Sequence, residues 1–189
     1  MCFKKQILKG EKLSIMKRTE ITSIQQLRKA LSKEAGHAGY SAIVDSINIP
    51  VKEIEPYQHW NGSHHTRVSL FDSEPIEAVL TCWEPGQSSA IHNYDFKQGW
   101  VLILQGQLYL ELYHLKNDRP VEVSEIALRD KGVFYLNDGM GFHRFSNNSP
   151  HRSLALFLYA SKVKRWTTFN VKTGSFDTVE TRYDHRPLF

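Results

Sequence analysis

The chain has 189 residues, of which 41% are hydrophobic and 23% are charged. This length predicts a single domain with a true hydrophobic core, because chains of this size bury roughly 70% of the surface that their unfolded state exposes. The 11 glycines and 7 prolines exclude a collagen-like or low-complexity chain, and no apolar run is long enough to predict a transmembrane helix.

The net charge of +4 originates in the first 18 residues. They hold six basic residues and one acidic residue, and the rest of the chain holds 18 basic and 19 acidic residues. We therefore expect residues 1–20 to form a basic, disordered tail and residues 21–189 to form one domain, with a helical segment over 21–60. Because the domain itself is nearly neutral, neither a nucleic-acid partner nor a membrane partner is predicted.

The two cysteines, Cys2 and Cys82, do not form the pattern of a disulfide framework. The N-terminal stretch lacks the long apolar core and the cleavage site of a secretory signal. Both observations favour a reducing, cytoplasmic location. Met16, followed by Lys17 and Arg18, leaves two candidate starts for the protein, Met1 and Met16.

Helical patterns come first along the chain. Ser23 and Gln26 form a capping-box pattern, and Leu27 and Leu31 follow on one helical face. We expect this helix over residues 23–35, packed by a narrow apolar face against another part of the protein. Two shorter helices are predicted over residues 40–46 and 51–54.

From about residue 64 the pattern changes to short strands separated by turns. The continuously apolar stretch Trp100–Leu104 predicts a strand that is buried on both faces. Short strands at regular spacing after a helical segment predict an all-β fold, either a small barrel or a double-sheet jelly roll. The predicted strands are residues 68–71, 76–83, 100–104, 108–113, 121–128, 132–136, 143–146, 154–160, 166–171 and 176–181.

The nine histidines are the residues that point most directly to chemistry. Four lie near predicted turns, helix ends or exposed strand positions and are expected to be surface residues: His37, His114, His151 and His185. Three precede the first strand, beside Arg67, and either line a pocket or belong to a solvated loop: His59, His64 and His65.

His92 and His143 stand in distinctive surroundings. His92 lies in Gly86-Gln-Ser-Ser-Ala-Ile-His92-Asn-Tyr94, and His143 lies in Asp138-Gly-Met-Gly-Phe-His143-Arg144. With Leu104-Gln-Gly106, these segments resemble the paired glycine–histidine motifs of the cupin superfamily. More narrowly, the chain resembles the thiol dioxygenases of the cysteine dioxygenase family. Three further segments support the narrower resemblance: Cys82-Trp83-Glu-Pro85-Gly86, Leu158-Tyr159, and His65-Thr-Arg67 in the place of a Tyr-Thr-Arg segment.

The resemblance spans roughly residues 60–165 and implies a cupin, a jelly-roll β-barrel. In that family a His-x-His pair and one later histidine bind a single Fe(II), which gathers a thiolate and O2. Imidazole ligands that leave coordination positions open suit this metal. The implied function is the addition of both oxygen atoms to the sulfur of a small thiol, such as cysteine, to give a sulfinate.

The same resemblance assigns roles to individual residues. His92 and His143 correspond to metal ligands. Arg67 corresponds to an arginine that pairs with the substrate carboxylate, with His65 beside it in the substrate-binding segment. Tyr159 corresponds to a buried catalytic phenol next to the metal.

The chain departs from the family pattern in the metal motif. The second histidine of the pair is Tyr94, which by strand alternation shares the inward face of His92. A phenol has an ordinary pKa of about 10, so a metal must lower it strongly for Tyr94 to be a ligand at neutral pH. Asp95 lies on the opposite face and coordinates only if the strand bulges.

The buried Ser-x-His-x-Tyr of the family is also changed. Here it becomes Ala155-Leu-Phe157-Leu-Tyr159, which keeps the tyrosine and loses the serine and histidine that would hydrogen-bond to it. Gly99 stands where some members carry a cysteine that cross-links to the tyrosine, and other members lack that cysteine.

Three hypotheses follow. The protein is an iron-dependent dioxygenase of a small thiol, with His92, His143 and Tyr94 around the metal. Alternatively, it is a catalytically inactive cupin without metal that binds a small carboxylate through Arg67. In the third hypothesis it is a different metalloenzyme that uses two histidines and a tyrosine in a more oxidised iron state.

Overall fold

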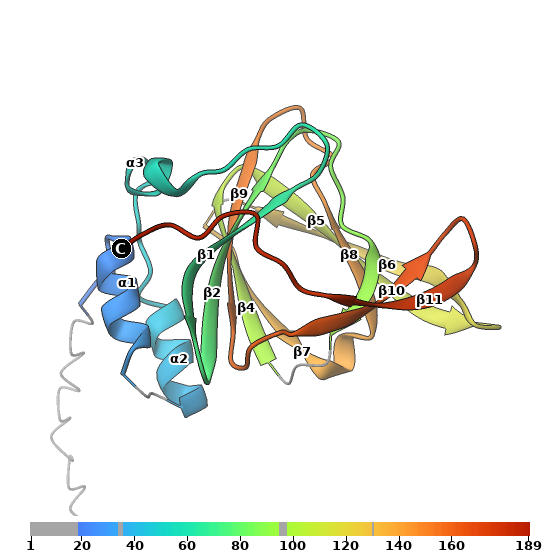
Figure 1. The fold of residues 1–189 in the computed structure, drawn as a ribbon, viewed down its shortest axis with the longest axis horizontal. Helices are drawn as coiled ribbons and strands as arrows, with labels where there is room; N and C mark the ends of the chain where they lie inside the picture. Colours follow the sequence, from blue (N-terminus) through green and yellow to red (C-terminus); the bar gives the residue numbers. More distant parts are fainter. Residues whose placement is uncertain (1–18, 34–35, 95–97, 130) are drawn as a thin grey trace, which may run out of the picture.

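The computed structural model describes residues 19–33, 36–94, 98–129 and 131–189. Its strands form two antiparallel sheets that enclose a common interior, and its helices lie at one side (Figure 1). The predicted all-β barrel with an N-terminal helical segment is confirmed. The expected basic tail lies almost wholly outside the described residues, as does Cys2. Within the described part, none of the helices is long and apolar enough to cross a membrane.

The two sheets contain five and six strands. The first has the order β1 (Thr66–Ser73), β2 (Ile76–Trp83), β9 (Ser153–Tyr159), β4 (Gln98–Gln105) and β7 (Val133–Asn137). The second has the order β11 (Ser175–Glu180), β10 (Arg165–Asn170), β3 (Ile91–Tyr94), β8 (Phe142–Ser146), β5 (Gln107–Lys116) and β6 (Arg119–Arg129). A 3-10 turn, η2 (Asp138–Met140), joins β7 to β8. The four-residue β3 is too short to show a strand period, and only the histidine motif pointed to it.

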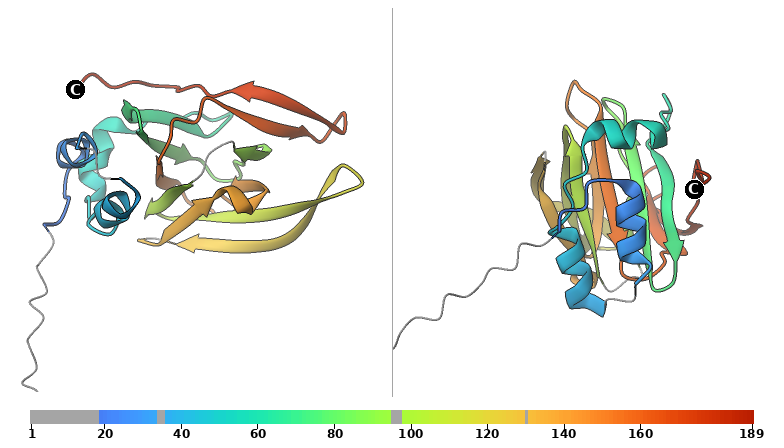
Figure 2. Two further views of the ribbon diagram at one scale, coloured as in Figure 1. Left: turned by 90° about the horizontal axis from the view of Figure 1, so that it is seen from below. Right: turned by 90° about the vertical axis from the view of Figure 1, so that its left-hand side faces the viewer.

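The helices cover the outer face of the first sheet (Figure 2). They are α1 (Ile24–Leu31), α2 (Gly36–Val44), α3 (Val51–Ile54) and the 3-10 helix η1 (Glu55–Tyr57). The Ser23 side chain caps α1 by accepting a 3.2 Å hydrogen bond from the Gln26 N–H. The Gln26 side chain completes the cap by accepting a 2.7 Å hydrogen bond from the Thr22 N–H, whereas a capping box would use the Ser23 N–H. The predicted α1 helix is confirmed, but it ends at Leu31, four residues before its predicted end.

Apart from its edge strand β7, the first sheet is buried on both faces because helices cover one side and the second sheet covers the other. Along β2, Leu80 and Cys82 pack toward the helices, whereas Val79 and Trp83 pack into the barrel interior. The same alternation makes β9 buried at every position. The predicted strand Trp100–Leu104 falls within β4, where Trp100–Ile103 are buried and Leu104 is half-buried.

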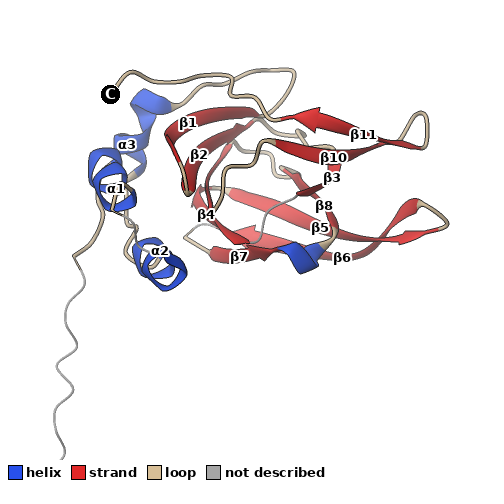
Figure 3. Cartoon of the chain, turned by 60° about the horizontal axis from the view of Figure 1, so that its bottom comes forward, coloured by secondary structure: helices blue, strands red, loops and turns tan. Residues whose placement is uncertain are grey.

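The second sheet differs because its β6 edge and its hairpin ends face solvent. The β5–β6 and β10–β11 hairpins extend to the side opposite the helices (Figure 3). After β11 the chain returns along β1, where the Ser69 N–H donates to the His185 carbonyl at 3.0 Å. The chain ends beside α1, where the centroid of the Phe189 ring lies 3.7 Å from the Arg28 guanidinium carbon.

The β4–β5 connection depends on a glycine. Gly106 has a φ of +74°, and a Cβ at this position would lie 2.7 Å from Ser153 Oγ and 2.8 Å from the Arg152 carbonyl oxygen. Gly106→Ala is therefore expected to lower the free energy of unfolding by about 2–4 kcal/mol, through backbone strain and overlap with β9.

Urea unfolding measures this effect. Gly62→Ala is the matched control, because a Cβ at Gly62 meets no atom within 4 Å. We expect the control to change the free energy of unfolding by less than about 0.5 kcal/mol. Equal effects of the two substitutions would contradict the assigned role of Gly106.

Candidate functional site

A cavity of about 70 Å³ lies inside the barrel between the two sheets. Its walls are mainly aromatic, and its lining includes one permanently charged side chain, that of Arg67. The lining residues are His65, Arg67, Thr81, Trp83, Ser89, Ala90, His92, Phe145, Phe157, Tyr159, Trp166 and Thr168.

His92 lines this cavity, and His143 lies opposite His92 on the neighbouring strand. They are register partners on the antiparallel strands β3 and β8. Both side chains are buried, and their ring centroids are 4.5 Å apart. The sequence places these histidines 51 positions apart, and the pairing of β3 with β8 brings them together.

Each of the two imidazoles is fixed by its own backbone. His92 Nδ1 donates to the Ala90 carbonyl at 2.7 Å, and His143 Nδ1 donates to the Gly141 carbonyl at 3.0 Å. Burial lowers the pKa of His92 well below its usual value and lowers that of His143 to about 4, so both rings are neutral at pH 7. A neutral ring that donates through Nδ1 carries its lone pair on Nε2, which is how metal-binding histidines are held.

The two histidines thus fit two positions of a metal site. Within the described residues, no third histidine, cysteine, aspartate or glutamate joins them in a cluster suited to a metal. The third position of the family pattern falls on Tyr94, the last residue of β3, whose backbone pairs with Trp166. The side chain of Tyr94 and the whole of Asp95 lie outside the described residues, so both assignments remain predictions.

Arg67 and His65 reach the cavity from the start of β1. The Arg67 side chain is buried, with its guanidinium carbon 5.1 Å from the Trp166 ring centroid. His65 stacks on Trp83 with centroids 4.0 Å apart and an interplanar angle of 5°. Burial, together with the positive charge of Arg67, lowers the pKa of His65 to about 4. The structure therefore brings both predicted substrate-binding residues to the cavity.

Tyr159 and the residues around it form another wall. Tyr159 is buried on the interior face of β9 and lines the cavity. Phe157 stacks against it with ring centroids 5.9 Å apart. On the neighbouring strand β4, Gly99 is the register partner of Tyr159. Phe157 thus places an apolar ring where the family pattern predicts a histidine.

Sequence reasoning missed the contribution of β10. Trp166 and Thr168 line the cavity because β10 pairs with β3 in a register that sets Thr168 opposite His92. The Trp166 ring lies 5.3 Å from that of His92. No local sequence pattern signals this wall, because it arises from the pairing of β10 with β3, two segments that are about 75 residues apart in the chain.

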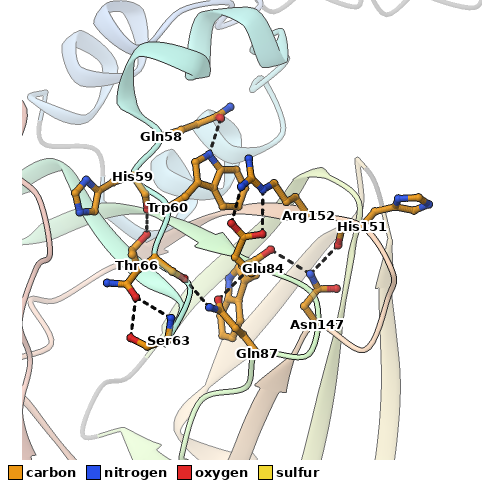
Figure 4. Close-up of polar contacts among 12 residues, drawn as sticks. Gln58, His59, Trp60, Ser63, Thr66, Glu84, Gln87, Asn147, His151 and Arg152 are labelled. Atoms are coloured by element: carbon orange, nitrogen blue, oxygen red, sulfur yellow. Dashed lines mark hydrogen bonds and ion pairs between the residues drawn. The ribbon is translucent and has the colours of Figure 1, made fainter.

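A polar network anchors the loops that lead into the site (Figure 4). The Gln87 side chain donates to the Asn61 carbonyl at 2.7 Å, which links the loop before β1 to the loop after β2. Asn147 Nδ2 donates to the Trp83 carbonyl at 3.1 Å and to the His151 carbonyl at 2.8 Å. These bonds hold the ends of β1, β2 and β8 together, and Trp83 carries the stack with His65.

Comparison with known proteins identifies the family. A family model described as "Cysteine dioxygenase type I" matches residues 10–171, which is most of the chain. The chain belongs to the cysteine dioxygenase type I family. Cysteine dioxygenase type 1 of Homo sapiens is 28% identical over 139 residues, covering 70% of this chain and 69% of the human one. The protein of the same name in Danio rerio is 29% identical over 159 residues, covering 74% and 78%.

Similar solved structures have lower sequence identity. A protein with a double-stranded β-helix domain from Klebsiella pneumoniae has a TM-score of 0.48 and 16% identity, covering 68% of this chain and 95% of its own. Membership of the cysteine dioxygenase family, together with the two antiparallel sheets, confirms the predicted cupin barrel. At the level of the family, the chain is a thiol dioxygenase-like oxidoreductase, and members of this family are in general non-haem iron enzymes.

The buried His65 predicts a loss of stability in acid. Because its pKa falls from 6.5 to about 4 in the folded state, the unfolded chain binds more protons in this window. The free energy of unfolding should therefore decrease as the pH falls from 6.5 to 4, by up to about 1.4 kcal/mol per pH unit from this residue.

Urea unfolding at pH 7 and pH 4.5 tests this expectation. His65→Gln should reduce the difference in the free energy of unfolding between the two pH values. The control His151→Gln changes an exposed histidine and should leave this difference as it is in the unsubstituted protein. An undiminished pH dependence in His65→Gln would contradict the assignment.

Proposed function

We propose that the protein oxidises a small thiol carboxylate with O2 and releases a sulfinate. The observation that carries this proposal is a cavity lined by His92 and a buried arginine, Arg67, with His143 packed against His92 and both imidazoles fixed by backbone carbonyls. The reaction balances without another oxidant. The thiol sulfur loses four electrons, O2 gains them, both oxygen atoms end on sulfur, and the thiol proton is released.

In this proposal Fe(II) is held by Nε2 of His92 and of His143, with Tyr94 in the third position. Bound Fe(II) supplies the redox chemistry that joins a thiolate to O2. The neutral state of both imidazoles suits this role, because a protonated ring has no lone pair to donate.

Arg67 is the proposed anchor for the carboxylate of the substrate. A guanidinium offers a planar pair of N–H donors that matches a carboxylate, and the aromatic walls exclude the water that would weaken this pairing. His65 sits beside it, and Tyr159 is the proposed catalytic phenol near the sulfur. The small cavity favours substrates of the size of cysteine, which gives the relatives their name, and of 3-mercaptopropionate.

A second candidate function is the binding of a small carboxylate without metal. Two observations favour it: the described residues contain no third acidic, histidine or cysteine ligand near His92 and His143, and Phe157 stands where the family pattern has a histidine. The positively charged Arg67 and the aromatic walls would serve this function equally well.

Metal analysis and O2 uptake distinguish the two candidates. We expect the purified protein to contain iron and to consume O2 with cysteine or 3-mercaptopropionate. His143→Ala should lower iron content at least about 10-fold, since one of two strong donors is lost, whereas the exposed control His151→Ala should not. Absence of both iron and O2 uptake would refute thiol oxidation and leave carboxylate binding. A visible charge-transfer band that disappears in Tyr94→Phe would instead favour a ferric phenolate enzyme.

A separate prediction concerns the missing histidine. If Tyr94 occupies the third ligand position, Tyr94→His restores the His-x-His pair and should raise iron affinity by about 10-fold or more. Competition with a colorimetric chelator measures the affinity. An unchanged affinity would mean that the cavity has lost more than this one ligand.

A further inference from the structure

A buried carboxylate lies inside the barrel next to the cavity, and no role has been assigned to it. Glu77 is fully buried on the interior side of β2. It accepts a hydrogen bond from the Tyr183 hydroxyl and another from the Val163 N–H at 3.2 Å. Burial raises the pKa of this carboxyl, while the Tyr183 hydrogen bond and the positive charge of Arg67 act in the opposite direction. Glu77 is thus within electrostatic reach of the arginine of the cavity.

Tyr183 connects Glu77 to Arg67. Its hydroxyl is held by Glu77, and its ring centroid lies 5.8 Å from the Arg67 guanidinium carbon. On the same ring, Arg186 lies 4.4 Å from the centroid. The ring therefore has its orientation fixed at the hydroxyl and contacts two guanidinium groups.

The C-terminal segment holds Tyr183 in register with Arg67. Asp184 Oδ2 accepts a 2.8 Å hydrogen bond from the Arg67 N–H, and the Asp184 N–H donates to the Arg67 carbonyl at 2.8 Å. This two-way pairing ties the residue after Tyr183 to the backbone of Arg67 itself. The C-terminal segment crosses back over β1 and thereby places the Tyr183 ring beside Arg67 (Figure 1).

The Arg67 guanidinium acts electrostatically both on Glu77 and on the histidines that line the cavity. Its charge lowers the pKa values of His65 and His92 on the cavity side, and it also acts on Glu77. Trp166 flanks the guanidinium at 5.1 Å and Tyr183 flanks it at 5.8 Å. Two aromatic rings thus flank a side chain that would otherwise sample many rotamers, and Glu77 holds one of these rings by its hydroxyl.

We propose that Tyr183 and Glu77 are positioning residues that fix the Arg67 guanidinium in the orientation from which it binds a carboxylate. Fixing a flexible side chain before binding removes an entropy cost from the binding step. The contribution to substrate binding rests on the proposed function, whereas the restriction of Arg67 is a property of the protein alone.

The chain supplies a matched control. Tyr113 donates a 2.5 Å hydrogen bond to Glu111, and Arg144 pairs with the same carboxylate. This second tyrosine–glutamate–arginine group lies on the opposite face of β5 from Leu110 and Leu112, outside the cavity lining. Tyr183→Phe and Tyr113→Phe therefore delete equivalent hydroxyls, one beside Arg67 and one remote from it.

The first measurement is the NMR signal of the Arg67 Nε–H, assigned by its loss in Arg67→Lys. Tyr183→Phe and Glu77→Gln should shift and broaden this signal, and Tyr113→Phe should not. An Arg67 signal that is unchanged in both variants overturns the proposal, whether or not the protein oxidises thiols. Thermal unfolding confirms that the variants are folded. If Glu77→Gln fails to fold, the result for Tyr183→Phe decides the proposal by itself, because this variant removes only the hydroxyl and retains the packed ring.

The second measurement is the affinity for 3-mercaptopropionate and for its neutral counterpart 3-mercapto-1-propanol, by calorimetry. Tyr183→Phe should weaken binding of the carboxylate about 3- to 10-fold, as expected when one side chain has to be immobilised during binding, and leave binding of the alcohol unchanged. Equal weakening of both ligands would indicate a merely structural role and overturn the proposal. If the Arg67 signal responds but the unchanged protein does not prefer the carboxylate, the proposed function fails and the restriction of Arg67 stands.

Discussion

The burial of the first sheet on both faces is the constraint on which the rest of the structure depends. Helices α1, α2 and α3 take up the outward side chains of β1, β2, β4 and β9, so the inward side chains of the same strands are free to build the interior. Because successive side chains of a strand point to opposite faces, each strand has one helix-facing set and one inward-facing set of side chains. Arg67, Thr81, Trp83, Phe157 and Tyr159 belong to the inward set and meet in one cavity. A shift of one residue in register would exchange this set for the helix-facing one.

The cavity combines apolar walls with a small number of fixed polar groups. Its histidines are neutral because burial and the charge of Arg67 oppose protonation. The guanidinium is stabilised by aromatic faces and by the nearby carboxylate of Glu77. Such a site suits a small anion, because it offers one positive charge in surroundings that exclude water. The same dry walls would limit the site to ligands of a few heavy atoms.

The positions at which this sequence departs from the family pattern lie close to the site. Phe157 and Ala155 lie on the wall that carries Tyr159, and Tyr94 ends the strand that carries His92. His92 and His143, which match the family motif, have their rings fixed by hydrogen bonds to backbone carbonyls. At the proposed carboxylate-binding end, Tyr183 and Asp184 of the C-terminal segment contact Arg67. Most departures from the family pattern lie near the proposed metal ligands and Tyr159, and His65 is the one beside Arg67.

The sequence by itself determined the fold class, nearly all of the strands and the motif residues. Apolar alternation and turn residues are local signals, so β2 and β4 could be predicted from neighbouring positions alone, and the spacing around His92 and His143 was sufficient to suggest the family. Only the tertiary structure decided that Trp166 and Tyr183 flank Arg67 and that Glu77 lies behind them. These contacts join segments about 100 residues apart through strand register and the path of the C-terminal segment, and no local pattern encodes either.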